Sequence, residues 1–86
     1  MTHYSLRIDQ AVSELISSFP AEPHDLLVLA CLDLQLNPYG LGRVVKRVGS
    51  VTTLTHDLAG LGLVVFDVDE EPEPPVITVT DVITLL

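Results

Sequence analysis

The 86-residue sequence predicts an α+β domain, in which one mainly antiparallel sheet carries two N-terminal helices packed on it. Apolar residues recur at helical spacing in the first half and β-branched runs fill the second, in the order β-α-α-β-β-β. The length allows one domain, residues 1–86, with a core that buries about 60% of the unfolded chain's surface. A hydrophobic content of 48% excludes intrinsic disorder despite a formal net charge of −8.

The first half of the chain predicts one strand and two helices. Side chains alternate between apolar and polar over residues 3–8, as in a half-buried strand. Asp9 is a suitable N-cap for the first helix, which Pro20 ends. A second helix begins at Glu22-Pro23 and runs to Leu36, before a loop over 37–42.

The second helix is apolar on nearly every side from Leu26 onward, interrupted only by Asp33 and Gln35. A helix of this kind is usually covered on every side, and one sheet cannot cover it alone. We therefore expect a second copy or a partner chain to cover part of it. The expected partner-binding residues are Leu26, Leu29, Leu32 and Leu36.

Three strands are predicted in the second half, at residues 48–55, 61–68 and 76–85. The run at 61–68 is almost continuously apolar, which is typical of a central strand buried on both faces. An acidic, proline-rich run follows it over 67–75. Because the run lacks the spacing and the turn glycine of an EF-hand, we interpret it as a solvated loop and not as a calcium site.

Basic residues are few and clustered. The chain has 4 Lys and Arg against 12 Asp and Glu, which argues against direct nucleic-acid binding. Arg43, Lys46 and Arg47 follow the glycine-containing loop, and with His56 they are the candidate catalytic residues. Such a group can bind a phosphate or an acidic segment of a partner. The alternative interpretation is that these charges pair with nearby carboxylates and keep the loop soluble. His56 can pair with Asp57 only if the chain bends there, since adjacent strand residues point to opposite faces.

Other features narrow the class of protein. The single Cys31 is expected to be buried, because it can form neither an internal disulfide nor a cysteine metal site. Three scattered histidines and the lack of a phosphate-binding loop predict neither a metal nor a cofactor. The longest apolar run, 26–32, is too short for a membrane helix, and the N-terminus does not resemble a signal peptide. We expect a cytoplasmic protein.

Four short segments carry a family resemblance. They are Tyr4-Ser-Leu-Arg-Ile-Asp-Gln-Ala11, Asn37-Pro38, Gly60-Leu-Gly-Leu-Val-Val-Phe-Asp-Val-Asp69 and Val76-Ile-Thr-Val-Thr-Asp-Val82. Together they resemble the RelE/ParE-type toxins of bacterial toxin–antitoxin pairs over residues 4–82. The resemblance implies the α+β fold predicted above and a protein partner, either an antitoxin-like chain or a second copy.

The chain departs from the family pattern at the ribonuclease site. The family strand reads G-x-Y-R-V-V-Y-x-I-D, and here Gly62 stands at its tyrosine and Leu63 at the arginine that stabilises the RNA phosphate. An apolar side chain cannot offset charge that develops on phosphate. Such toxins are also generally basic and their antitoxins acidic, whereas this chain is acidic. The resemblance therefore implies a protein-interaction module with a degenerate ribonuclease site.

Two alternatives remain open from the sequence. The first is a divergent ribosome-dependent mRNA interferase, an endoribonuclease that uses Arg43, Lys46, Arg47 and His56. The second is a non-toxic structural or regulatory dimerisation module.

Overall fold

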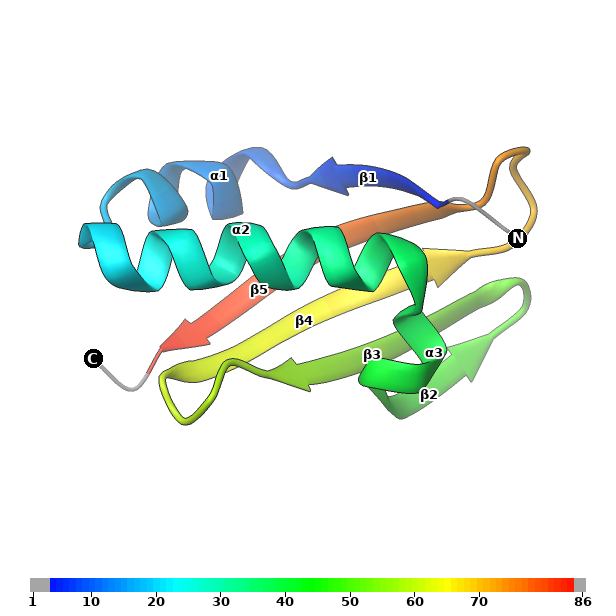
Figure 1. The fold of residues 1–86 in the computed structure, drawn as a ribbon. Coiled ribbons are helices and arrows are strands. Elements are labelled where there is room, and N and C mark those ends of the chain that lie inside the picture. Colours follow the sequence, from blue (N-terminus) through cyan, green and yellow to red (C-terminus); the bar gives the residue numbers. More distant parts are fainter. Residues whose placement is uncertain (1–3, 85–86) are drawn as a thin grey trace.

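The computed structural model describes residues 4–84, which form one five-stranded sheet with helices packed against it (Figure 1). In chain order the elements are β1 (Ser5–Ile8), α1 (Gln10–Ser17), α2 (Ala21–Leu36), α3 (Pro38–Leu41), β2 (Arg43–Val48), β3 (Val51–Asp57), β4 (Gly62–Asp69) and β5 (Val76–Thr84). None of these helices is long and apolar enough to span a membrane.

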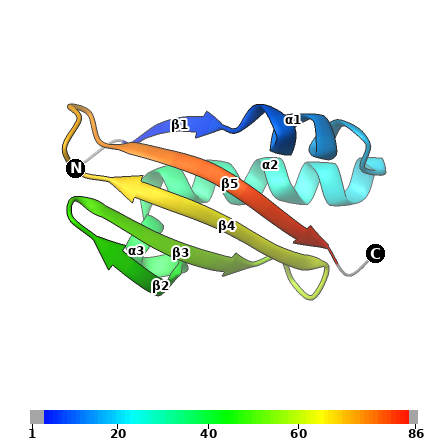
Figure 2. The same cartoon turned by 180° about the vertical axis from the view of Figure 1, so that it is seen from behind.

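The strand order in the sheet is β1-β5-β4-β3-β2. β1 pairs with β5 in parallel, with Ser5 opposite Val76, and every other pair is antiparallel. α2 lies across one face of the sheet, and α1 continues from β1 beside β5 (Figure 1). The view from behind shows no helix over the other face among the described residues (Figure 2). The predicted fold class, with its mainly antiparallel sheet, is confirmed.

The local sequence accounts for the helix boundaries. The Asp9 carboxylate accepts the Ala11 amide at 3.0 Å and caps α1, as predicted. α2 starts beyond Pro20 and carries Pro23 in its first turn, where a missing N–H leaves no hydrogen bond unmade. Asn37 ends α2 and also caps α3, because its side-chain oxygen accepts the Gly40 amide at 3.1 Å.

The sheet has one strand more than predicted. The segment Arg43–Val48, interpreted from the sequence as part of a charged loop, forms the edge strand β2. Gly49, with φ of 60°, and Ser50 then form the tight turn into β3. Three cations and three valines in six residues are compatible with an edge strand, where every side chain can reach water. A short helix, α3, also occupies the predicted loop.

The core lies between α2 and the sheet. It consists of apolar side chains from both layers, Tyr4, Val12, Ile16, Leu27, Ala30, Cys31, Leu34, Leu54, Leu58, Val64, Phe66, Val68, Ile77, Val79 and Val82. β4 is the central strand, but only alternate residues are buried, so the prediction of burial on both faces is wrong. Leu63 keeps 38% of its surface exposed, because no described element covers that side of the sheet.

Candidate functional site

The outward side of α2 carries a row of exposed apolar side chains, which we call the outer stripe. Leu29, Leu32, Leu36 and Val28 keep 59%, 52%, 58% and 45% of their surface exposed. Three of the four residues predicted to bind a partner belong to this row, whereas Leu26 is half-buried. Sequence reasoning missed Val28, because apolar residues on every side of a helix do not reveal which side faces the sheet.

Helical spacing explains why one helix is apolar on two sides. Leu27, Ala30, Cys31 and Leu34 repeat every three or four residues and pack into the core. The outer stripe repeats in the same way on the opposite side. One set of residues therefore serves the fold, and the other makes no contribution to the core of the single chain.

A small apolar hollow adjoins the outer stripe between β1, α1 and α2. It has a volume of about 150 Å³ and is lined by Leu6, Ile8, Ile16, Leu27, Val28, Cys31 and Leu32. Burial raises the pKa of the Cys31 thiol, so this side chain behaves as a neutral apolar group near pH 7. The sequence could not reveal the hollow, because it forms only where three separate elements meet.

The candidate catalytic residues are divided between the two faces of the sheet. Arg43 and Lys46 pair with Thr55 and Thr53, which face away from the helices. Arg47 pairs instead with the buried Thr52, and its Nε donates to the threonine hydroxyl at 3.1 Å. Cross-strand partners share a face of the sheet, so Arg47 does not point toward the other two cations.

His56 is also on the helix side of the sheet. It pairs with the buried Val64, and its Nδ1 lies 3.2 Å from the carbonyl oxygen of Leu41. Asp57 points the other way and accepts the Gly60 amide at 3.1 Å. The chain therefore does not bend to pair this histidine with its neighbouring carboxylate.

We call the side of the sheet that faces away from the helices the open face. A pocket of about 440 Å³ there is lined by Leu41, Gly42, Arg43, Thr55, Asp57 and Leu63. Leu63, which the sequence resemblance aligns with the family arginine, contributes an apolar side chain there. Gly62, which the resemblance aligns with the family tyrosine, has no space for a side chain, because a Cβ would meet the carbonyl oxygen of Ile83. Of the residues around this pocket, Arg43 is the one cation and Asp57 the one anion.

The acidic run is engaged in local hydrogen bonds. Asp69 accepts from the Ser50 hydroxyl at 2.9 Å and from the Glu71 amide at 3.0 Å. Asp67 lies in β4 and accepts from the Thr53 hydroxyl at 2.6 Å. Across residues 4–84 no three histidine, cysteine or acidic side chains are grouped in a way that could hold a metal ion.

Two solved structures of toxin–antitoxin complexes contain chains with this fold. A chain of the archaeal RelE–RelB complex from Pyrococcus horikoshii matches with a TM-score of 0.81 and 18% identity, over 98% of this chain and 96% of that one. A chain of the toxin–antitoxin complex RelBE2 from Mycobacterium tuberculosis matches with a TM-score of 0.77 and 17% identity, over 95% of this chain and 98% of that one. No protein-family profile and no curated protein sequence matches the chain. The chain thus has a RelE-like toxin fold, as the sequence resemblance implied.

Proposed function

We propose that this chain is a RelE-like protein that works through protein contacts and is bound by an antitoxin-like partner chain in the cytoplasm. The observation that carries the proposal is the outer stripe, where four apolar side chains of one helix lie exposed. Water-exposed apolar patches of this kind mark interaction surfaces. The structures with the same fold are complexes of two different proteins, which supports a partner chain over a second copy.

The placement of the basic residues supports a role without RNA cleavage. Stabilising a phosphate during cleavage requires cations that converge on one point. Here Arg43 and Lys46 lie on the open face, and Arg47 and His56 on the helix face. The open face also carries a carboxylate. Thr53 is the cross-strand partner of Lys46, and its hydroxyl donates to Asp67.

Inducing the chain in a bacterial host tests this proposal when growth and the integrity of a reporter mRNA are followed together. We expect the reporter mRNA to stay intact. We also expect replacement of Arg43, Lys46 and Arg47 by alanine to leave the growth of the induced culture as it is with the wild-type chain. Growth arrest with mRNA cleavage that the three alanines abolish would overturn the proposal and establish the interferase instead.

The interferase is the second candidate because of one observation. Arg43 and Lys46 lie on the same face of β2, and Arg43 lines the open pocket.

The alternative of a dimerisation module is tested by measuring the mass of the purified chain by light scattering. A monomer is expected under our proposal, whereas a dimer that Leu29→Ser together with Leu32→Ser dissolves would favour self-association.

A further inference from the structure

The helical half of the chain carries only one sign of formal charge. Residues 9–42 contain no lysine or arginine, whereas they include the acids Asp9, Glu14, Glu22, Asp25 and Asp33. Three of the four basic residues instead lie in β2, at the far edge of the sheet from β1. The fourth, Arg7, lies in β1 between Leu6 and Ile8, which line the hollow, so strand alternation turns it to the other face of the sheet. The surface that displays the outer stripe is therefore apolar and acidic.

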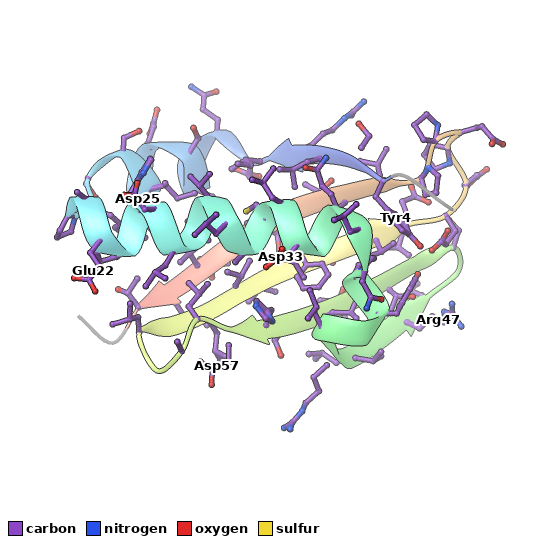
Figure 3. All side chains as sticks on the ribbon, in the orientation of Figure 1. Tyr4, Glu22, Asp25, Asp33, Arg47 and Asp57 are labelled. Carbon is purple, nitrogen blue, oxygen red and sulfur yellow. The ribbon has the colours of Figure 1, made fainter. Side chains whose placement is uncertain are left out.

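Three of these carboxylates lie on α2 itself, next to the outer stripe. Helical spacing places Asp25 one turn before Leu29 and Asp33 one turn after it, while Glu22 precedes Asp25. Figure 3 shows Glu22 and Asp25 near the start of α2 and Asp33 farther along it, with Arg47 beyond α3. All three acids are exposed, and across residues 4–84 none pairs with lysine or arginine; Asp25 Oδ1 lies 3.4 Å from the Nδ1 of its neighbour His24.

A second copy of the chain does not suit this surface. Packing two α2 helices stripe to stripe would bring six carboxylates together at one interface. Like charges at an interface repel and lose their hydration, which opposes the gain from burying leucine. A partner with lysine or arginine around its own apolar residues would instead pair with the same carboxylates.

The form of the surface favours a helical partner. The backbone groups of α2 are bonded within the helix, so an extended segment cannot add to it as a strand adds to a sheet edge. A ridge of apolar side chains beside a hollow is the geometry that receives a second helix. The hollow lined by Val28, Cys31 and Leu32 can take an apolar side chain from that helix.

From these observations we infer that the partner docks on α2 through an amphipathic helix whose apolar side is flanked by lysine and arginine. This inference rests on the proposed function and names the chemistry of its partner. The polarity is the reverse of the one that the family resemblance implies, in which a basic toxin meets an acidic antitoxin. Here the toxin-fold chain supplies the acids.

A fluorescent designed peptide tests this inference by anisotropy. The probe is an 18-residue helix of leucine and lysine, and its control has the same leucines with glutamate in place of every lysine. We expect the lysine peptide to bind the full chain and the glutamate peptide not to bind. Leu29→Ser with Leu32→Ser should weaken binding of the lysine peptide at least about tenfold, since these side chains form the centre of the surface.

Two sets of charge variants separate a docking surface from attraction to net charge. The helix set is Glu22→Gln, Asp25→Asn and Asp33→Asn, and the matched set is Glu71→Gln, Glu73→Gln and Asp81→Asn, which changes the net charge equally. The helix set should raise the Kd for the lysine peptide roughly tenfold, and the matched set less than about twofold. Circular dichroism checks that every variant is folded.

Three outcomes would overturn the inference: equal weakening by both sets, binding of the glutamate peptide as tight as that of the lysine peptide, and no binding of either. The proposed function fails separately, through cleavage of the reporter mRNA. A chain that cleaves RNA and still selects the lysine peptide would lose the proposed function and keep this docking surface. An RNA-inactive chain without the selectivity would lose only the inference.

Discussion

Leu29 and Leu34 lie on opposite sides of α2, and their exposed fractions differ completely. Leu34 is inaccessible to solvent, whereas Leu29 keeps 59% of its surface exposed. The same residue type thus has two roles within two helical turns. Leu34 holds the helix on the sheet, and Leu29 is free to contact a partner.

Truncating these two leucines should change the free energy of unfolding by very different amounts. Leu34→Ala should lower the free energy of unfolding by about 3 kcal/mol, because it leaves a cavity in a packed core. Leu29→Ala should change it by less than about 0.5 kcal/mol, because the side chain is already hydrated. Urea denaturation measures both. A large, concentration-dependent loss for Leu29→Ala would show that another copy covers the outer stripe in solution.

The hydrogen bond between Tyr39 and Glu70 fastens α3 to the residue after β4. The Tyr39 hydroxyl donates to Glu70 Oε1 at 2.6 Å, and Tyr4 approaches the same oxygen at 3.5 Å. Tyr39→Phe should therefore lower the free energy of unfolding by about 1 kcal/mol at pH 7. A hydrogen bond to a charged acceptor contributes more than this when it is buried, but solvent weakens it at this exposed position. Tyr4→Phe, the matched control, should cost less because its contact is longer. Equal losses in urea denaturation would contradict this ranking.

The same contacts predict a loss of stability in alkali. Burial, together with the Glu70 carboxylate, raises the pKa of both Tyr4 and Tyr39 in the folded chain. A tyrosine whose pKa is raised in the folded chain contributes its full stabilisation below the ordinary tyrosine pKa of about 10. This contribution is lost as the pH rises through the pKa of the folded state. The free energy of unfolding should fall above about pH 10 and fall less steeply in the Tyr39→Phe variant. Parallel pH profiles for the two proteins would rule out this coupling.

The sequence was sufficient to predict the elements that local patterns determine. Asp9, Pro20 and Pro23 mark the helix ends by their own chemistry, and the predicted cap is present. The alternation over β1 and the β-branched runs of β4 and β5 also indicate strands directly. These features depend on neighbouring residues alone, so no knowledge of the tertiary structure is needed.

Features that depend on distant residues were not predicted. β2 was missed because its charges resemble a loop, and only pairing with β3 makes it a strand. Strand alternation alone would put Arg43 and Arg47 on the same face, with Lys46 on the other. A register shift between Val44 and Lys46 places Arg43 with Lys46 instead, and no local pattern records that shift. The bond between Tyr39 and Glu70 joins residues 31 positions apart.

Gly42 lies where backbone and core meet closely, at the start of β2. A Cβ there would come within 2.7 Å of Phe66 Cζ and 2.9 Å of the Pro38 carbonyl oxygen. Gly42→Ala should therefore destabilise the protein by about 2 kcal/mol through overpacking. Gly60→Asn is the control, because the space around Gly60 is open and asparagine tolerates its φ of 84°. If thermal unfolding gives both variants the same loss, the close approach at Gly42 is not the cause.

Cys31 provides a chemical probe of the hollow beside the outer stripe. Its buried thiol has a raised pKa, and the thiolate is the form that attacks thiol reagents. We expect a neutral disulfide reagent to label the folded chain roughly a hundredfold more slowly than the chain unfolded in urea, because labelling requires local opening. Leu32→Ala should speed labelling of the folded chain by widening the hollow, whereas Leu36→Ala, which leaves the hollow lining intact, should not. The rate should also rise with pH past the ordinary cysteine pKa of about 8.5 without levelling off there. Rapid labelling of the folded wild-type chain at pH 7 would mean that the hollow opens to solvent in solution.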